Sequence, residues 1–484
     1  MISAVRNNLF ISLSSLAFLL LSSFLIWFDL FWLCLFPLAL FGVYAAIYHS
    51  QLIFLSLAFL TPLSVNIEEF TESVGLFVPT EPFFFGFMLL TIFFELRKRT
   101  FSKNVFNHPI VLAAGFYLLV IFISSITSTH PLVSFKFLLA KLWFFIPLLI
   151  LGPVYFKEKK NIYWFLFLFV LGTAIAGVYT LIHHSTYNFG EKEGHWVMYP
   201  FFKDHTIYGA IIAFVLPWSV ALFFLKETNP LEKVGLATIV TIIVIALFFS
   251  YTRAAWLSVI GALFVWLLIY FRIKLSYLLV IGFFSLFSLF VFWDQIQMEL
   301  ERNDEVHTTE EFGTRLQSAA NVSTDASNLE RINRWACAIE MFKEKPILGF
   351  GPGTYQFEYA QFQEPENLTI ISTNFGDMGN AHSEYLGALS ETGIFGLLSF
   401  LVLIVIVFYK GITLFYKSTG DRAQQAIILS SILALSTYFI HAFLNNYLDT
   451  DKAAVPILGI CAIFIALESN RKATDKASQK TIVH

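Results

Sequence analysis

The chain of 484 residues contains little charge and little cysteine. Charged residues make up 13% of it, whereas an ordinary soluble domain carries roughly 25%. Apolar residues make up 57% of the chain, and the aromatic residues among them make up 18% of the chain. This balance excludes a disordered chain, a basic nucleic-acid-binding protein and a disulfide-rich secreted scaffold. The three cysteines, Cys34, Cys337 and Cys461, suggest neither a disulfide pair nor a zinc site.

Long apolar runs take the place of the missing charge. A membrane-spanning helix needs about 20 mainly apolar residues, and such runs predict an all-α polytopic membrane protein with about fourteen spans (12–14). The stretch after Arg6 is read as the first span rather than a signal peptide, because no small-residue cleavage site follows it. The candidate spans are 9–28, 31–48, 51–65 (the weakest), 79–96, 109–127, 133–154, 162–182, 206–225, 234–250, 254–271, 276–293, 393–409, 426–444 and 453–468.

The few charges are distributed unequally between the two sides. Alternate loops and both termini hold 19 of the 31 basic residues, and this bias assigns them to the cytoplasm. The opposite side holds residues 294–392, with 17 acidic and 6 basic residues. We expect this long insertion to fold as a helical cap. The predicted organisation is a transmembrane bundle at 1–293, the large extracytoplasmic loop at 294–392, C-terminal transmembrane helices at 393–468 and a cytoplasmic tail at 469–484.

One segment of the large loop has the spacing of an amphipathic helix that ends at Pro346. Its apolar residues are Ile332, Trp335, Ala336, Ile339 and Phe342. At about 100° per residue, Arg331 lies at the margin of this stripe and Arg334 points farther round toward water. If the stripe packs on the membrane domain, Arg331 is the arginine delivered to the interface.

Polar motifs gather on the extracytoplasmic side. Residues 250–256 read Ser-Tyr-Thr-Arg-Ala-Ala-Trp and form a tight turn between two spans. Arg253 in this turn can reach lipid headgroups or bind a substrate; the scarcity of Lys and Arg on this side favours binding. Three glycines follow the loop helix and are read as a turn, because no βαβ context supports a nucleotide loop; they are Gly349, Gly351 and Gly353.

Two histidines on the same side are candidates for chemistry. His382 is either structural or catalytic, and capping of the next helix by Asn380 would place it in the first turn. There the helix dipole disfavours the imidazolium, leaving the neutral form that a general base needs. Lys203, Asp204 and His205 with Tyr208 open a span. They are either a positioning ion pair at a helix start or part of a substrate site.

Taken in order, the motifs resemble those of the O-antigen ligase and polymerase superfamily of bacterial envelope glycosyltransferases, over residues from about 200 to 445. They are Ser-x-x-Arg-x-x-Trp, an Arg-x-x-x-Trp helix ending in Pro-x-x-Gly-x-Gly-Pro-Gly, and Asn-x-His-x-Glu-Tyr-Leu leading to Glu-x-Gly-x-x-Gly. The resemblance implies a GT-C-like multi-pass protein of the inner membrane with its active site facing the periplasm. It implies transfer of a glycan from undecaprenyl diphosphate to lipid A core, a growing polysaccharide or a protein hydroxyl, without a metal or other cofactor.

The resemblance also implies roles for individual residues. Arg253 and Arg331 match the family's functional arginines, and guanidinium groups suit a diphosphate because they bind phosphate oxygens in pairs and stay charged. They would stabilise the charge developing on the leaving group. His382 matches the essential histidine, which takes the proton from the attacking hydroxyl or orients it. Ala381 departs from the proline that relatives often carry at this position. Candidate substrate contacts are Arg315, Arg334, Lys203, His205 and Tyr385.

The acceptor and the class of activity stay open at this point. A ligase acting on lipid A core is favoured slightly over a polymerase or a protein O-oligosaccharyltransferase. A transporter or flippase is the alternative from another class, although ionisable residues within the spans are sparse and the polar groups gather on one face instead of at the midplane. A structural anchor would leave the motifs unexplained. The expected partners are the lipid-linked glycan donor, the acceptor and the lipid bilayer, with no nucleic acid.

Overall fold

The structure is a computed structural model that describes residues 15–27 and 42–68 apart from 17, 43 and 46, together with 75–98, 101, 103–225, 230–273, 326–364, 368 and 379–482. The chain divides into two compact units, Met1–Ser56 and Leu57–His484. Within the first unit, the described residues include a short apolar helix at Phe18–Trp27.

The second unit is built almost entirely of helices. The α-helices in chain order are α3 (Ser50–Leu60, which begins in the first unit), α5 (Thr80–Lys98), α6 (Lys103–Phe106), α7 (Pro109–Ile126), α8 (Pro131–Ile146), α9 (Gly152–Tyr155), α10 (Lys159–Ser185), α11 (His205–Leu225), α12 (Pro230–Phe248), α13 (Arg253–Tyr270), α17 (Ala326–Glu344), α18 (Tyr355–Glu358), α19 (Glu384–Lys417), α20 (Arg422–His441) and α21 (Asp451–Ile482). Short 3-10 or π segments lie at η2 (Thr61–Leu63), η3 (Pro147–Leu151), η4 (Glu193–His195) and η5 (Tyr359–Phe362). Strands β1 (Val65–Asn66) and β2 (Phe77–Val78) pair antiparallel, with Val65 opposite Val78.

The predicted all-α, multi-pass character is confirmed. Nine helices among the described residues are long and apolar enough to cross a membrane. The predicted spans at 31–48 and 276–293 lie largely or wholly outside those residues, so the number of about fourteen stays a prediction. The GT-C-like layout and the predicted domain boundaries also stay predictions. Proline begins α7, α8 and α12, at a position where its missing N–H costs no intrahelical hydrogen bond.

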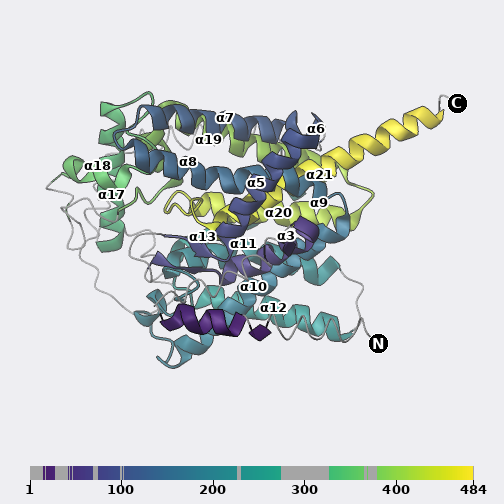
Figure 1. The fold of residues 1–484 in the computed structure, drawn as a ribbon, viewed down its shortest axis with the longest axis horizontal. Coiled ribbons are helices and arrows are strands. Elements are labelled where there is room, and N and C mark those ends of the chain that lie inside the picture. Colours follow the sequence, from purple (N-terminus) through teal and green to yellow (C-terminus); the bar gives the residue numbers. More distant parts are fainter. Residues whose placement is uncertain are drawn as a thin grey trace. The chain divides into compact units, whose positions relative to one another are not determined.

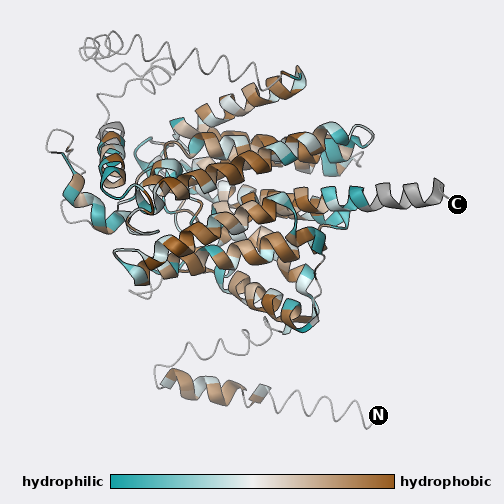
Figure 2. Ribbon diagram, turned by 90° about the horizontal axis from the view of Figure 1, so that it is seen from above, coloured by the Kyte–Doolittle hydropathy of each residue, from teal (hydrophilic) through white to brown (hydrophobic). Residues whose placement is uncertain are grey.

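The long helices pack into a bundle with α21 at its centre. Of the nine candidate spans, α21 has the largest buried share, at 83%. Around it, α11 and α13 pack on α20, and α7 packs on both α8 and α19 (Figure 1). Figure 2 shows that these helices are hydrophobic along most of their lengths. Such helices bury apolar surface on one another and present the remainder to lipid.

The described part of the predicted cap is helical. Helix α17 covers the predicted amphipathic segment and ends before Pro346, as expected. It lies with α18 at one end of the long helices, on the left in Figure 1. The cap has a core of its own: Cys337, Ala338, Met341, Phe350, Tyr355, Tyr359 and Ala381. Its two tyrosines, Tyr355 and Tyr359, are 2% and 0% exposed.

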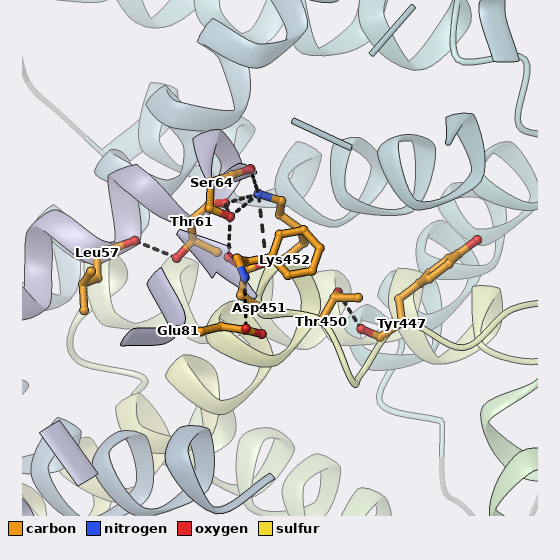
Figure 3. A network of polar contacts seen from close by, with 9 residues as sticks. Leu57, Thr61, Ser64, Glu81, Tyr447, Thr450, Asp451 and Lys452 are labelled. Carbon is orange, nitrogen blue, oxygen red and sulfur yellow. Dashed lines mark hydrogen bonds and ion pairs between the residues drawn. The ribbon is translucent and has the colours of Figure 1, made fainter. Parts of the chain in front are cut away.

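A buried polar network joins the start of α21 to the segment after α3 (Figure 3). The ammonium of Lys452 donates to the backbone oxygens of Thr61 at 2.6 Å and Ser64 at 2.8 Å, and also contacts the Ser64 hydroxyl. That hydroxyl donates to Asp451 at 2.5 Å. Lys452 and Asp451 are both fully buried. Buried charges are tolerated when each is paired and hydrogen-bonded, so this network fixes the segment after α3 against α21.

Candidate functional site

Arg331 on α17 lies where four elements meet. Its positive charge acts on the rings of His382 before α19, His205 at the start of α11 and His441 at the end of α20. The predicted apolar stripe is not the buried face of α17, because Ile339 is 42% exposed whereas Asn333, Arg334, Cys337, Ala338 and Met341 are buried. The expectation that this stripe packs on the membrane domain and delivers Arg331 is therefore not borne out. This end of the bundle is where the site predicted from the sequence assembles.

Arg334 has a different environment from the one predicted. It is 5% exposed, and its Nε donates to Glu330, one turn earlier, at 2.6 Å. The guanidinium also lies 4.0 Å from the ring centre of Tyr359 in η5. The expectation that Arg334 points to water is wrong, because the cap folds over that face of α17. Its role as a substrate contact stays a prediction.

Arg253 is the first residue of α13, directly after the tight turn that the sequence predicts. Tyr251 in this turn has a positive φ of 50°. Thr252, the N-cap of α13, donates its hydroxyl to the backbone oxygen of His205 at 2.7 Å. This bond joins the starts of α11 and α13, so Arg253 lies beside the start of α11 at the same end of the bundle as Arg331.

His382 lies before α19 rather than in its first turn. The N-cap is Ser383, whose hydroxyl accepts from the backbone N–H of Leu386 at 3.4 Å. Asn380 instead accepts from the backbone N–H of His382 at 3.0 Å. The predicted cap is therefore wrong. His382 adopts a positive φ of 47°, which a non-glycine residue rarely does outside functional or tightly fixed positions.

Burial and nearby charge, rather than a helix dipole, are the features of the structure that favour the expected neutral imidazole. Burial, followed by the charges of Arg331 and Arg334, lowers the pKa of His382 to about 4, while Glu330 and Asn445 act in the opposite sense. Desolvation and nearby positive charge both disfavour an imidazolium. At neutral pH the ring is uncharged and has one nitrogen lone pair able to accept a proton.

Residues 203–205 were predicted to be either a positioning ion pair at a helix start or part of a substrate site, and the structure shows how they lie at the start of α11. The carboxylate of Asp204 accepts from the backbone N–H groups of Thr206 at 2.8 Å and Ile207 at 3.1 Å, so it caps this helix. The ring of His205 stacks on that of His195 at 4.1 Å. Lys203 is exposed and lines a cavity. Tyr208 is 1% exposed and belongs to the core.

That cavity, of about 390 Å³, has Asn380 and Ala381, the two residues before His382, in its wall. His382, Arg253 and Arg331 are not among its lining residues. Charged residues of both signs, amides and aromatics surround it. This mixture suits a sugar, whose hydroxyls need donors and acceptors and whose faces lie on aromatic rings. Its polar and aromatic lining is Asn66, Phe77, Phe137, Phe201, Phe202, Lys203, Asp204, Tyr355, Gln356, Asn380, Glu391, Asn446, Tyr447, Asp449, Thr450 and Lys452.

The glycine-rich segment after α17 is a turn, as predicted. Gly349, Gly351 and Gly353 all have positive φ. A Cβ on Gly349 would lie 2.3 Å from the carbonyl carbon of Glu391, so only glycine fits against α19 there. The carboxylate of Glu391 accepts from the backbone N–H groups of Gly353 and Tyr355, both at 3.0 Å. Glu391 thereby fixes the turn at the cavity wall.

The loop between α20 and α21 was missed by the sequence reasoning. Nδ2 of Asn445 in this loop lies 3.0 Å from Nε2 of His441. Glu384 holds the loop, because one of its carboxylate oxygens accepts from the backbone N–H groups of Tyr447 at 2.8 Å and Leu448 at 2.7 Å. The available signal was the polar run at 445–452 between two apolar spans on the extracytoplasmic side.

Two other predicted contacts have no place in the cavity wall. The hydroxyl of Tyr385 donates to the backbone oxygen of Phe439 at 2.9 Å, and its ring packs on Phe443 at 4.4 Å. Tyr385 therefore joins α19 to α20, and its substrate role stays a prediction. Arg315 lies outside the described residues. Within the described ranges, no group of three or more His, Cys, Asp and Glu side chains is arranged to hold a metal ion.

Comparison with known families matches residues 237–401 to the family model described as O-antigen ligase. The matched region contains Arg253, Arg331, Arg334 and His382, whereas Lys203, His205 and Asn445 lie outside it. No curated protein matches the chain. The predicted resemblance to the O-antigen ligase superfamily is confirmed by the family match.

Proposed function

We propose that this multi-pass membrane protein, which carries an O-antigen ligase domain at residues 237–401, transfers a glycan from undecaprenyl diphosphate to an acceptor hydroxyl. The reaction takes place on the periplasmic face of a bacterial inner membrane, with lipid A core as the favoured acceptor. The observation that carries this proposal is a buried His382 on which the charge of Arg331 acts, directly after two residues, Asn380 and Ala381, that line the cavity. A base adjacent to a permanent positive charge suits the attack of an acceptor hydroxyl on the anomeric carbon of a glycan whose leaving group is a diphosphate.

The donor diphosphate is assigned to Arg253 and Arg331. A diphosphate is a dense anion, and in a partly desolvated site it needs donors that remain charged. Guanidinium groups bind its oxygens in pairs and stabilise the negative charge that develops as the sugar–phosphate bond breaks. The bond between Thr252 and His205 holds the α13 start near the residues that Arg331 faces.

The acceptor is assigned to the cavity lined by Asn380 and Asn446. Its hydroxyl oxygen attacks the anomeric carbon, the bond from that carbon to the phosphate oxygen breaks, and undecaprenyl diphosphate leaves with the bonding electrons. His382 accepts the hydroxyl proton through its free nitrogen lone pair. A polymerase or a protein O-oligosaccharyltransferase would differ from the ligase only in the acceptor that fills the cavity.

Purified protein with an undecaprenyl-diphosphate-linked glycan and candidate acceptors tests this proposal. We expect transfer to continue in the presence of EDTA, in keeping with a reaction that needs no metal. The triple variant Arg253→Ala, Arg331→Ala and His382→Ala should lose transfer by at least about 1,000-fold, since each group acts on the transition state.

Arg422→Ala is the matched control, because it removes an exposed arginine at the opposite end of α20. Its transfer rate should equal that of the wild type. Full transfer by the triple variant, with unchanged amounts of folded protein, would disprove the mechanism.

A further inference from the structure

Two neighbouring cavities lie at the end of the bundle opposite His382. The first, of about 290 Å³, lies where the starts of α10 and α20 meet the ends of α11 and α21. The second, of about 560 Å³, lies between α10 and α12 and is called the aromatic groove below. Tyr163 lines both, so the two adjoin along α10. None of the residues that line them was assigned to glycan transfer.

The aromatic groove is apolar and opens toward lipid. The rings of Tyr163 and Phe167 stack with their centres 6.1 Å apart, and Trp164 packs edge-on against Phe167 at 5.8 Å. On the side of α12, Gly235 leaves open space, because a Cβ there would meet no atom within 4 Å. Both helices are candidate spans, and only 22% of the apolar window of α12 is buried. The groove therefore offers a flexible apolar chain an aromatic wall to pack on.

The first cavity has a polar mouth formed by the start of α10. Lys159 pairs with Asp421 at 2.6 Å, and Lys160 pairs with Glu158 at 3.2 Å. The two lysine side chains are 63% and 71% exposed. Exposed ion pairs contribute little to stability, so either ammonium can exchange its carboxylate for a phosphate oxygen at small cost.

The charge around this mouth is positive on balance. Residues 157–160 and 421–422 contain four basic and two acidic side chains. Across the groove, Glu232 is followed directly by Lys233, so the start of α12 adds no net charge. The bias of lysine and arginine assigns this end to the cytoplasm, where basic pockets between membrane helices bind the headgroups of anionic lipids.

We infer that the two cavities form one binding site for an anionic glycerophospholipid of the cytoplasmic leaflet. Its phosphodiester lies at Lys159 and Lys160, and one of its acyl chains lies in the aromatic groove. The polar mouth and the groove follow one another along α10 in the order of a headgroup and its chain. The site does not depend on the proposed glycan transfer. A lipid bound there stabilises the folded bundle, because it binds the packed helices and not the unfolded chain.

Native mass spectrometry of the full chain in detergent tests the inference. The protein is titrated with phosphatidylglycerol or with phosphatidylcholine of the same acyl chains. We expect one phosphatidylglycerol to be retained about 10- to 30-fold more tightly, because the surplus of basic side chains favours the anionic headgroup. The double variant Lys159→Ala, Lys160→Ala should lose this preference. Lys417→Ala, which removes an exposed lysine at the same end but outside both cavities, should keep it.

A second variant tests the groove. Gly235→Leu fills the open space on α12 and should lower the affinity for phosphatidylglycerol at least about 10-fold. Gly115→Leu is its control, because Gly115 in α7 also has no atom within 4 Å of its Cβ position and lines neither cavity. Thermal unfolding without added lipid shows whether each variant is folded.

Fluorescence gives an independent measurement of the same site. Phosphatidylglycerol with brominated acyl chains quenches a tryptophan that it contacts, and Trp164 lines the groove. Trp164→Phe should remove the saturable part of this quenching. Equal retention of the two lipids by the wild type would overturn the inference, and so would unchanged retention by folded Gly235→Leu. An absence of saturable binding, as expected if another segment of this chain fills the groove, would overturn it as well.

Discussion

The neutral ring of His382 depends on burial and on neighbouring positive charge at once. Its ordinary pKa of 6.5 falls to about 4 in the folded protein. Between these values the unfolded chain binds a proton that the folded chain does not, so the stability contributed by this residue is lost as the pH falls from about 6.5 to 4. Catalysis by the neutral ring should persist over the same interval.

The pH dependence of His382 gives the first prediction at this scale. The acid limb of transfer activity should have a midpoint near 4 rather than near 6.5. In an NMR titration, Arg331→Ala should raise the pKa of His382 toward its ordinary value, because a facing positive charge is removed. Arg422→Ala should leave it unchanged. A midpoint near 6.5 in the wild type would contradict the burial described for this ring.

The candidate residues could be chosen from the sequence, but several of their contacts could not be predicted from it. Helical periodicity placed Arg331 and Arg334 on different faces of α17, yet periodicity contains no information about what covers each face. Tyr359, distant in sequence, lies over Arg334. Likewise both Asn380 and Ser383 are good capping residues, and the local sequence could not show which one begins α19.

The turn after α17 connects the cap to α19 by close backbone contact. Phe350 and Gly351 donate their N–H groups to the backbone oxygens of Ser390 at 3.2 Å and Glu391 at 2.8 Å. Ser124 of α7 donates to the Leu348 oxygen at 2.5 Å. The cavity wall at this point is therefore held by backbone groups that leave no room for side chains.

Two glycine substitutions test how much this close backbone contact between the turn and α19 contributes to stability. Gly349→Ala combines a φ of +67° with a Cβ 2.3 Å from the Glu391 backbone, and should cost at least about 2 kcal/mol. Gly235→Ala in α12 meets no atom within 4 Å and should stabilise the helix by up to about 1 kcal/mol. Thermal unfolding in detergent measures both. A wild-type Tm for folded Gly349→Ala would show that the turn relaxes freely.

The loop between α20 and α21 shows why an element can be missed. Its neighbours in the sequence are two spans, and hydropathy treats whatever joins them as a connection. The position of this loop is fixed by partners distant in the sequence. Lys141 of α8 pairs with Asp449 at 2.5 Å, and Glu384 of α19 accepts from two backbone N–H groups of the loop. Such contacts depend on packing that no local pattern encodes.

At the scale of the whole molecule, the all-α class and the multi-pass character followed from composition and apolar run length. Which end of the described bundle faces the cytoplasm stays a prediction. Ion pairs join Lys159 to Asp421 at 2.6 Å, and both Lys410 and Lys472 to Glu468, at the end assigned to the cytoplasm. The His382 site lies at the other end.

Sided labelling of single cysteines tests this orientation. In a background without Cys34, Cys337 and Cys461, Lys203→Cys should react with an impermeant maleimide added to intact cells. Gly420→Cys, on the exposed turn between α19 and α20, should react only after the inner membrane is opened. Labelling of both positions from the same side would contradict the assignment of the site to the periplasmic face.

The ammonium bound by Thr61 and Ser64 has a consequence for biosynthesis. Lys452 lies 391 residues after Thr61 along the chain, so a ribosome must translate all of the intervening residues before this contact forms. Until then, the oxygens of Thr61 and Ser64 lack the ammonium that binds them in the finished bundle. Nascent chains halted before α21 should therefore keep the segment after α3 accessible to proteases and insertion factors.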